Sequence, residues 1–104
     1  MGKGKGEMRL FEEIWKERPH VCKECGCHLG FMLVPHFFSH YLSKGSEPAL
    51  RLDKDNIDLL CFKHHFQWDS GDRKKMKIYD EERIERLKLK AHQQRTSYGY
   101  QSGT

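Results

Sequence analysis

The sequence lacks any long apolar run. No stretch of its 104 residues approaches the roughly 18 consecutive apolar residues that a transmembrane helix needs. The first residues alternate glycine and lysine and hold no apolar core of the kind found in secretory signal peptides. We therefore expect no membrane partner and an intracellular, cytoplasmic location.

Apolar residues are also scarce. They make up 37% of the chain against 33% charged residues, so the chain can bury only one small core. We expect a single domain over residues 1–104. Domains of this size often need a metal ion or disulfide bonds for stability. Because thiols stay reduced in the cytoplasm, the four cysteines favour a metal site over two disulfides.

Two short motifs can supply the ligands of that metal. Cys22 and Cys25 form a Cys-x-x-Cys knuckle, and Cys61 and His64 form a Cys-x-x-His knuckle. Three thiolates and one imidazole suit a tetrahedral structural zinc site whose four positions are all filled by protein. We therefore expect these four residues to converge in space.

Neighbouring residues leave alternatives open at both knuckles. Cys27 and His28 follow the first knuckle and compete as ligands, and a set with Cys27 in place of Cys25 stays open. His65 directly follows His64, so the two histidines can exchange roles. The two-residue gap after Cys61 favours His64 for zinc.

Positive charge is concentrated in one segment. Residues 73–95 carry nine Lys or Arg and four Asp or Glu, a surplus of five, whereas the rest carries ten basic and eleven acidic residues, a deficit of one. A basic segment fits contact with a phosphate backbone. It also fits an ordinary solvated helix face.

Hydrophobic periodicity, Gly and Pro give a provisional order of elements. Residues 1–6 read as a flexible leader and residues 96–104 as a tail that frays. An apolar stripe of Leu10, Phe11, Ile14 and Trp15 predicts a packing helix. The expected elements are a helix over 7–17, the first knuckle over 21–30, a strand over 31–42, a loop over 43–55, a strand over 57–61, a helix over 62–69 and a basic helix over 80–95.

This order resembles the ββα-metal fold of HNH endonucleases. The resemblance covers about residues 20–70, and it is strongest to small phage HNH proteins of the NinG type and looser to phage endonuclease VII. It implies a small α+β fold with a zinc-stapled core over about residues 20–71, flanked by an N-terminal helix and a basic C-terminal helix. The positions that carry it are Ser39-His40, Lys44-Gly45, Pro48, Leu50-Arg51-Leu52-Asp53, Asn56-Ile57, Leu60-Cys61 and His64-His65.

The resemblance implies catalytic roles for three residues. His40 matches the general base that deprotonates the attacking water, a task suited to an imidazole because its pKa lies near neutrality. Asn56 matches the residue that braces the loop and orients that histidine. His65 matches a ligand of a catalytic divalent cation.

The rest of the cation site is less regular. Asp69 lies one helical turn after His65, and a carboxylate suits Mg²⁺ or Mn²⁺, with Ni²⁺ and Zn²⁺ as alternatives. The family usually has an acid or a histidine just before the base, but this chain has Ser39. His36, four residues before His40, is a substitute ligand, a substrate contact or a packed residue.

The resemblance predicts a phage-encoded, metal-dependent DNA endonuclease that hydrolyses phosphodiester bonds and works in the host cell on branched or recombination DNA. Lys44, Arg51 and Lys63 are candidate DNA contacts. A homodimer is one arrangement for symmetric cleavage. The alternatives are a non-catalytic zinc-knuckle module that binds nucleic acid and a zinc-stapled protein-interaction module.

Overall fold

The computed structural model describes the backbone of residues 2–103 and the side chains of residues 6–94. The helices and strands are α1 (Gly2–Glu17), β1 (Phe38–His40), β2 (Ile57–Leu59), α2 (Phe62–Asp69) and α3 (Glu81–Gly103). Turns of 3₁₀ helix lie at Pro35–Phe37, Pro48–Leu50 and Lys54–Asn56. The expected small α+β class is confirmed. Among the described helices, none has the length and apolar character that a membrane crossing demands.

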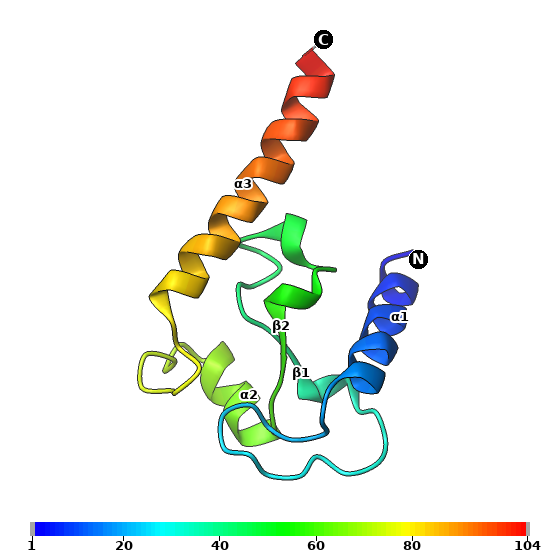
Figure 1. Ribbon diagram of the computed structural model, residues 1–104, viewed down its shortest axis with the longest axis vertical. Helices are drawn as coiled ribbons and strands as arrows, with labels where there is room; N and C mark the ends of the chain where they lie inside the picture. The colour runs from blue at the N-terminus through cyan, green and yellow to red at the C-terminus, as the bar shows by residue number, and fades with distance from the viewer. Residues whose placement is uncertain (1, 104) are drawn as a thin grey trace.

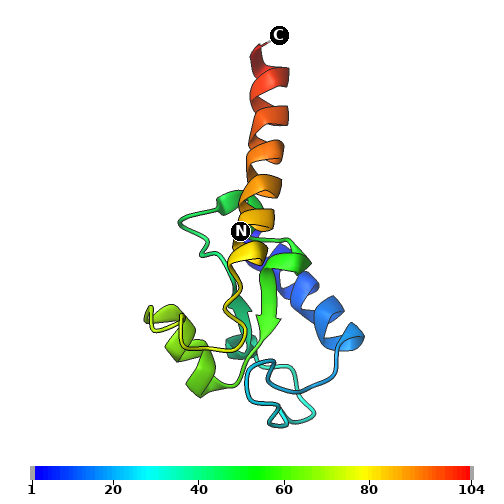
Figure 2. The same ribbon diagram turned by 60° about the vertical axis from the view of Figure 1, so that its left-hand side comes forward.

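A short antiparallel hairpin of β1 and β2 lies at the centre of the molecule (Figure 1). Figure 2 shows α1 on one side of it and α2 on the other. Because side chains alternate along a strand, the two faces of the hairpin carry different residues. The cross-strand pairs are Phe38–Leu59 and His40–Ile57 on the α1 face, and Ser39–Asp58 on the opposite face.

The apolar stripe of α1 closes the first face. Phe11 stacks on Phe38 with 4.2 Å between ring centroids, and Ile14 is fully buried. Leu10 and Trp15 pack at the edge of the same core. The predicted role of this stripe as a packing face is therefore confirmed, and the stripe is used within the chain.

Tyr41 and Trp68 fix α2 and the start of α3 to the hairpin. Their rings stack at 4.6 Å, and the indole N–H of Trp68 donates to the carbonyl of Tyr41 at 3.0 Å. The Tyr41 hydroxyl donates to the carbonyl of Ile78 at 2.9 Å and accepts from the amide of Asp80 at 2.7 Å. Both aromatic side chains are 1% exposed, so each polar atom is paired where water is excluded.

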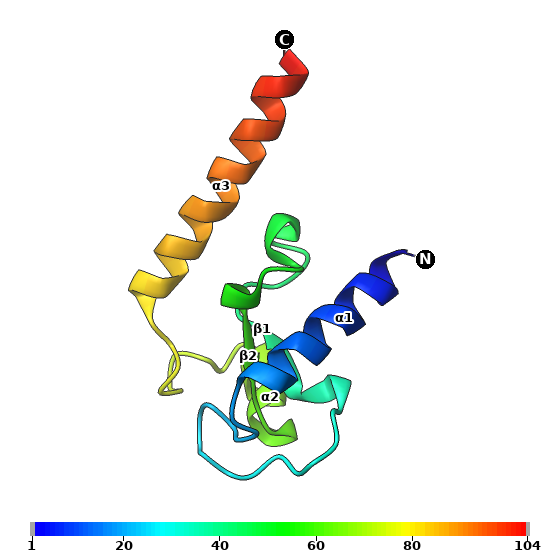
Figure 3. The same ribbon diagram turned by 45° about the vertical axis from the view of Figure 1, so that its right-hand side comes forward.

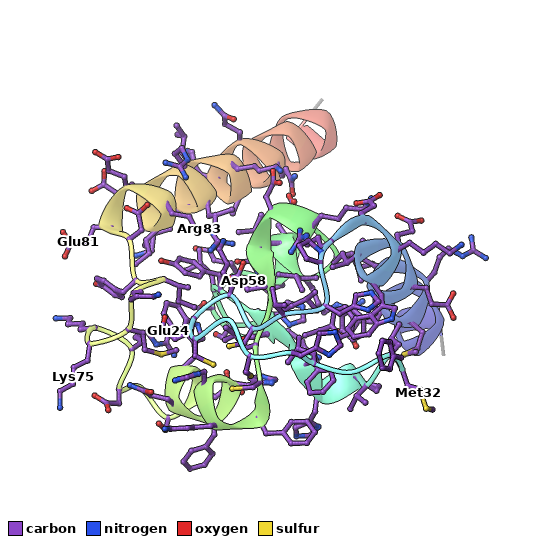
Figure 4. The ribbon with its side chains drawn as sticks, turned by 60° about the horizontal axis from the view of Figure 1, so that its bottom comes forward. Glu24, Met32, Asp58, Lys75, Glu81 and Arg83 are labelled. Atoms are coloured by element: carbon purple, nitrogen blue, oxygen red, sulfur yellow. The ribbon has the colours of Figure 1, made fainter. Side chains whose placement is uncertain are left out.

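A buried ion pair joins α3 to the second face of the hairpin. Arg83 binds both carboxylate oxygens of Asp58, at 2.8 and 2.9 Å, and Asp58 is 2% exposed. Figure 4 shows the two side chains pointing toward each other. The guanidinium also lies 3.9 Å above the ring of Tyr41. Beyond this contact, the C-terminal half of α3 projects away from the body (Figure 3).

The predicted strands are shorter than expected. The predicted bounds of the first strand, 31–42, were wrong. Only Phe38–His40 pairs with β2, and Pro35–Phe37 forms a 3₁₀ turn. Pro35 lacks an amide hydrogen for a ladder and suits the first position of a helical turn. The strand over 57–61 ends at Leu59, since Cys61 already caps α2.

The end helices are longer than expected. The backbone of residues 2–6 is helical and continues α1, whereas the predicted helix began at residue 7. α3 starts at Glu81 and continues through residues 96–103, where fraying was expected. No proline interrupts either segment, and glycine lowers helix propensity without forbidding a helix. The side chains of residues 1–5 and 95–104 lie outside the described part. α2 matches the predicted 62–69, and Gly71 (φ 94°) follows its end as predicted.

Candidate metal centre and the histidines beside it

The four residues of the two knuckles converge at one point. The ligand atoms of Cys22, Cys25, Cys61 and His64 all lie within 4.8 Å of one another. Nδ1 of His64 is 3.7 Å from Sγ of Cys22 and 3.3 Å from Sγ of Cys61, and Sγ of Cys25 is 4.0 Å from Sγ of Cys61. Among the described side chains, no other group of three or more Cys, His, Asp or Glu residues converges in this way.

These distances fit a tetrahedral zinc ion. Zn–S bonds of about 2.3 Å and Zn–N bonds of about 2.0 Å place two sulfurs about 3.8 Å apart, and a sulfur and a nitrogen about 3.5 Å apart. The three separations are within about 0.2 Å of those values. Three thiols and an imidazole are also the donor set of structural zinc sites. The cluster therefore fits a structural zinc.

Local backbone geometry brings the knuckles together. The amide of Gly26 donates to the carbonyl of Cys22 at 2.8 Å, and Gly26 has a φ of 78°, which glycine adopts without strain. The amide of Lys23 donates to the carbonyl of Leu59 at 2.8 Å, which ties the first knuckle to the end of β2. Two residues later Cys61 caps α2, whose first turn carries His64.

The first knuckle is also tied to the segment before α3. Oε2 and Oε1 of Glu24 accept from the amides of Lys77 and Ile78 at 2.8 and 3.0 Å. Figure 4 shows Glu24 below Asp58 and Arg83. The knuckle, the hairpin and α3 therefore hold one another in place.

Hydrogen bonds prepare the first knuckle to bind a cation. Burial raises the pKa of the Cys22 thiol, but backbone N–H groups of Cys61 and Cys25 and the ring of His64 outweigh it, so the net pKa is lowered. The pKa of Cys25 is lowered by hydrogen bonds from the amide and thiol of Cys27. Burial raises the pKa of Cys61, and the neighbouring Cys22 adds to this effect. Thiolates are the form that zinc binds.

The competing ligands lie outside the tetrahedron. Cys27 is not part of the converging group, and the neighbouring Cys25 thiol, together with burial, raises the pKa of Cys27 to about 12. His28 instead accepts from the amide of Gly30 at 3.0 Å through Nδ1. His65 points elsewhere, as described below. The geometry therefore favours Cys25 over Cys27 and His64 over His65.

His40 ends β1 and is held by the following loop. Its Nε2 lies 2.8 Å from the carbonyl oxygen of Arg51, and its side chain is 10% exposed. A carbonyl can only accept, so Nε2 carries the hydrogen and Nδ1 keeps the lone pair. Burial is the main cause that lowers the pKa of His40 below its ordinary value of 6.5, and the charge of Lys44 adds to it. The ring is therefore neutral near pH 7.

Asn56 holds the same loop from inside. Its Oδ1 accepts from the amide of Leu42 at 2.7 Å, and its Nδ2 donates to the carbonyls of Leu42 and Leu50 at 2.9 and 3.3 Å. Its carbonyl accepts from the amide of Tyr41 at 2.7 Å. Asn56 is fully buried. The bracing contacts that the resemblance implied are therefore present, one residue before the strand that pairs with β1.

His65 contacts Asp69 and the backbone of His36. Nδ1 of His65 lies 2.5 Å from the carbonyl oxygen of His36, and Nε2 lies 3.1 Å from Oδ2 of Asp69. A neutral imidazole has one N–H and satisfies only one of these acceptors. A bound cation at Nε2 would satisfy the other. The His36 ring is 5.8 Å from that of His65, and the side chains of His36, His65 and Asp69 do not form a three-ligand cluster.

The histidines predicted to share one site contact different elements. His40 faces α1, as Phe38 does two residues earlier, whereas α2 packs on Tyr41, which points the other way. Ser39 is buried on the face opposite His40, and no hydrogen-bond partner is found for its hydroxyl among the described residues. Neither Ser39 nor His36 therefore supplies an acid beside His40.

A carboxylate beside His40 was missed in the sequence. Oε2 of Glu7, on α1, lies 3.0 Å from Nζ of Lys44, 3.7 Å from Nη1 of Arg51 and 4.0 Å from Nε2 of His40. The sequence does contain a signal for this contact: Glu7, Phe11 and Ile14 have the i, i+4, i+7 spacing of one helix face, so Glu7 lies on the face that packs on the core. Two of the three predicted DNA contacts thus meet at His40. Lys63 is exposed on α2, apart from them.

No protein-family model, curated protein sequence or solved structure matches this chain.

Proposed function

We propose that this protein is a metal-dependent DNA endonuclease of the HNH type. The observation that carries the proposal is the setting of His40, a neutral, partly covered imidazole at the end of a strand. The loop that holds it is locked by Asn56, and two cations, Lys44 and Arg51, lie beside it. A base poised near neutrality next to phosphate-binding cations is what hydrolysis of a phosphodiester needs.

The orientation of the His40 ring supports the choice of Nδ1 as the base. Nε2–H is used by the carbonyl of Arg51, so Nδ1 takes a proton from the attacking water. The water oxygen then bonds to phosphorus and the bond to the 3′ oxygen breaks. Arg51 and Lys44 bind non-bridging oxygens of the phosphate and balance their charge.

His65 and Asp69 are the residues that fit the catalytic cation. Two ligands at right angles around Mg²⁺, each about 2.1 Å from the ion, are about 3.0 Å apart. The separation of 3.1 Å matches that geometry. When bound, the cation would act as a Lewis acid on the phosphate and the leaving oxygen. The His36 carbonyl, by accepting from Nδ1, leaves the lone pair of the His65 ring on Nε2.

The test is nicking of supercoiled plasmid with Mg²⁺ or Mn²⁺. His40→Ala should reduce the rate by about 10²- to 10⁴-fold, the usual contribution of a general base. His28→Ala is the matched control, because His28 is exposed and outside both sites. Zinc content is measured for each variant. A His40→Ala protein that keeps its zinc and cleaves at the wild-type rate would overturn the assignment.

The second candidate is a zinc-stabilised module that binds nucleic acid without cleaving it. Two observations favour it: only the zinc cluster has three converging ligands among the described side chains, and His40 and His65 contact different elements. It predicts DNA binding with no cleavage under any divalent cation. The two candidates are separated by cleavage assays on linear, nicked, flap and four-way DNA, each with magnesium, manganese, nickel and zinc. The same assays report the preferred substrate.

A homodimer stays a prediction of the nuclease proposal. The apolar stripe of α1 is not free to form its interface, since Phe11 and Ile14 are buried within the chain. Leu89, on α3, is 57% exposed and is available for such a contact. Sedimentation of wild type and Leu89→Glu with and without DNA measures the oligomeric state.

A further inference from the structure

Three groups from separate parts of the chain surround one carboxylate oxygen. Oε2 of Glu7 lies 3.0 Å from Lys44, 3.7 Å from Arg51 and 4.0 Å from His40. Lys44 comes from the loop after β1, Arg51 follows the 3₁₀ turn Pro48–Leu50, and His40 ends β1. These groups converge without Glu7 being near any of them in sequence, so they form an anion site within the fold.

Glu7 occupies this site without optimal hydrogen bonds. Its Oε2 is shielded from solvent, yet no described donor is aligned on it for a hydrogen bond, although Lys44 is close. The Glu7 side chain is 18% exposed, whereas those of Lys44 and Arg51 are 53% and 23% exposed. A buried anion without aligned donors is a poor match for its site. A phosphodiester has two charged oxygens with which to engage the same donors.

We propose that Lys44 and Arg51 form, beside His40, a binding site for a DNA phosphodiester that Glu7 fills in the free protein, so that DNA and Glu7 compete. The proposal rests on the proposed function only for the choice of ligand. It makes the first half of α1 a cover over His40 and assigns Glu7 the place of a phosphate.

The surroundings of Glu7 allow this exchange. Phe11 and Ile14 anchor the second half of α1 in the core, and neither has to move. The first half holds glycine at positions 2, 4 and 6, each worth about 1 kcal/mol less than alanine in a helix. A Cβ at Gly6 would lie 3.3 Å from Leu52, so glycine lets α1 approach the loop that carries Arg51. Unwinding these first turns releases Glu7 and leaves the fold intact.

The experiment measures duplex DNA binding by fluorescence anisotropy without added magnesium or manganese, so cleavage plays no part. Glu7→Gln is compared with Glu12→Gln, which changes the net charge equally on the same helix. Glu12 is exposed, and among the described residues no ion pair to it is found. Zinc content and circular dichroism check the fold of each variant.

We expect Glu7→Gln to bind DNA about three- to fivefold more tightly than Glu12→Gln, the size of a partly exposed ion pair that DNA no longer has to break. The dependence of log K on log salt should be the same for both variants, because DNA forms the same phosphate contact once Glu7 is displaced. Lys44→Met in the Glu7→Gln background should cancel the gain in affinity.

Two results would overturn the proposal. Equal affinity of Glu7→Gln and Glu12→Gln would show that Glu7 does not compete with DNA. Weaker cleavage by Glu7→Gln at unchanged affinity would make Glu7 a positioning residue for His40 instead. Failure of the nuclease proposal is a separate outcome, namely DNA binding without cleavage by every variant, and it leaves the affinity comparison valid.

Discussion

Serine at position 25 should weaken zinc binding far more than serine at position 27. Sγ of Cys25 belongs to the metal cluster, whose ligand atoms lie within 4.8 Å of one another. Cys27 lies beside Cys25 but outside this cluster. Structural zinc contributes about 10–16 kcal/mol in small domains, or about 2.5–4 kcal/mol for each of four ligands. Cys25→Ser should therefore reduce zinc affinity by roughly 100- to 1,000-fold.

Cys27→Ser should cost much less. A serine hydroxyl can still donate toward Cys25, so the loss should stay near the lower end of the range for outer-shell partners, at most about tenfold. Both variants remove one thiol, which makes them a matched pair.

The assay is competition for zinc against a colorimetric chelator, with thermal melting of zinc-loaded and zinc-free protein alongside. The melting temperature should drop most for Cys25→Ser, because zinc joins the first knuckle to α2 and its binding energy stabilises the fold. Equal losses for the two serine variants would refute the ligand set, and a larger loss for Cys27→Ser would show that Cys27 replaces Cys25.

Three further predictions follow from the loop and the second face of the hairpin. Asn56→Ala should destabilise the fold by about 3 kcal/mol or more in urea titrations, because buried backbone groups of Leu42 lose their partners. Arg83→Met should cost up to about 3 kcal/mol, because the buried Asp58 then keeps only the half-exposed Lys23, at 3.3 Å, as a charged partner, and adding Asp58→Asn should recover part of this loss. Since burial lowers the pKa of His40, plasmid cleavage should be constant from pH 7 to 8 and fall only as protonation removes the lone pair below pH 6.5.

The sequence predicted the elements that have strong local signals. Cys-x-x-Cys and Cys-x-x-His spacings fix ligands within one turn of chain, so the metal cluster could be predicted without knowing the fold. The stripe around Phe11 and Ile14 has a helical period and indicated α1 directly. The strand over 31–42 was overestimated because its apolar composition says nothing about pairing, and only three residues of it find a partner.

The site beside His40 could be predicted only in part. Asn56 and Arg51 lie in the same loop, so their approach to His40 follows from a short connection. Glu7 lies 33 residues before His40, and its position depends on how α1 packs across the hairpin. Tertiary packing of this kind leaves no trace in local spacing beyond an acid on an otherwise apolar helix face.

The charges around Glu7 bear on where a catalytic cation can bind. An acid was expected just before His40, and the chain has Ser39 there instead. Glu7 approaches the same histidine from α1, but Lys44 and Arg51 share its carboxylate. Two fixed positive charges within about 4 Å of that oxygen would repel a divalent cation.

In the nuclease proposal the cation ligands are therefore expected on α2, where His65 and Asp69 lie 3.1 Å apart. Asp69→Asn should then raise the concentration of Mn²⁺ needed for half-maximal cleavage by about tenfold or more, because it replaces the only carboxylate of the His65–Asp69 pair by a neutral amide. Glu7→Gln should leave that concentration unchanged while altering DNA affinity. A shift in the Mn²⁺ requirement with Glu7→Gln and none with Asp69→Asn would place the cation beside His40 and refute this division of roles.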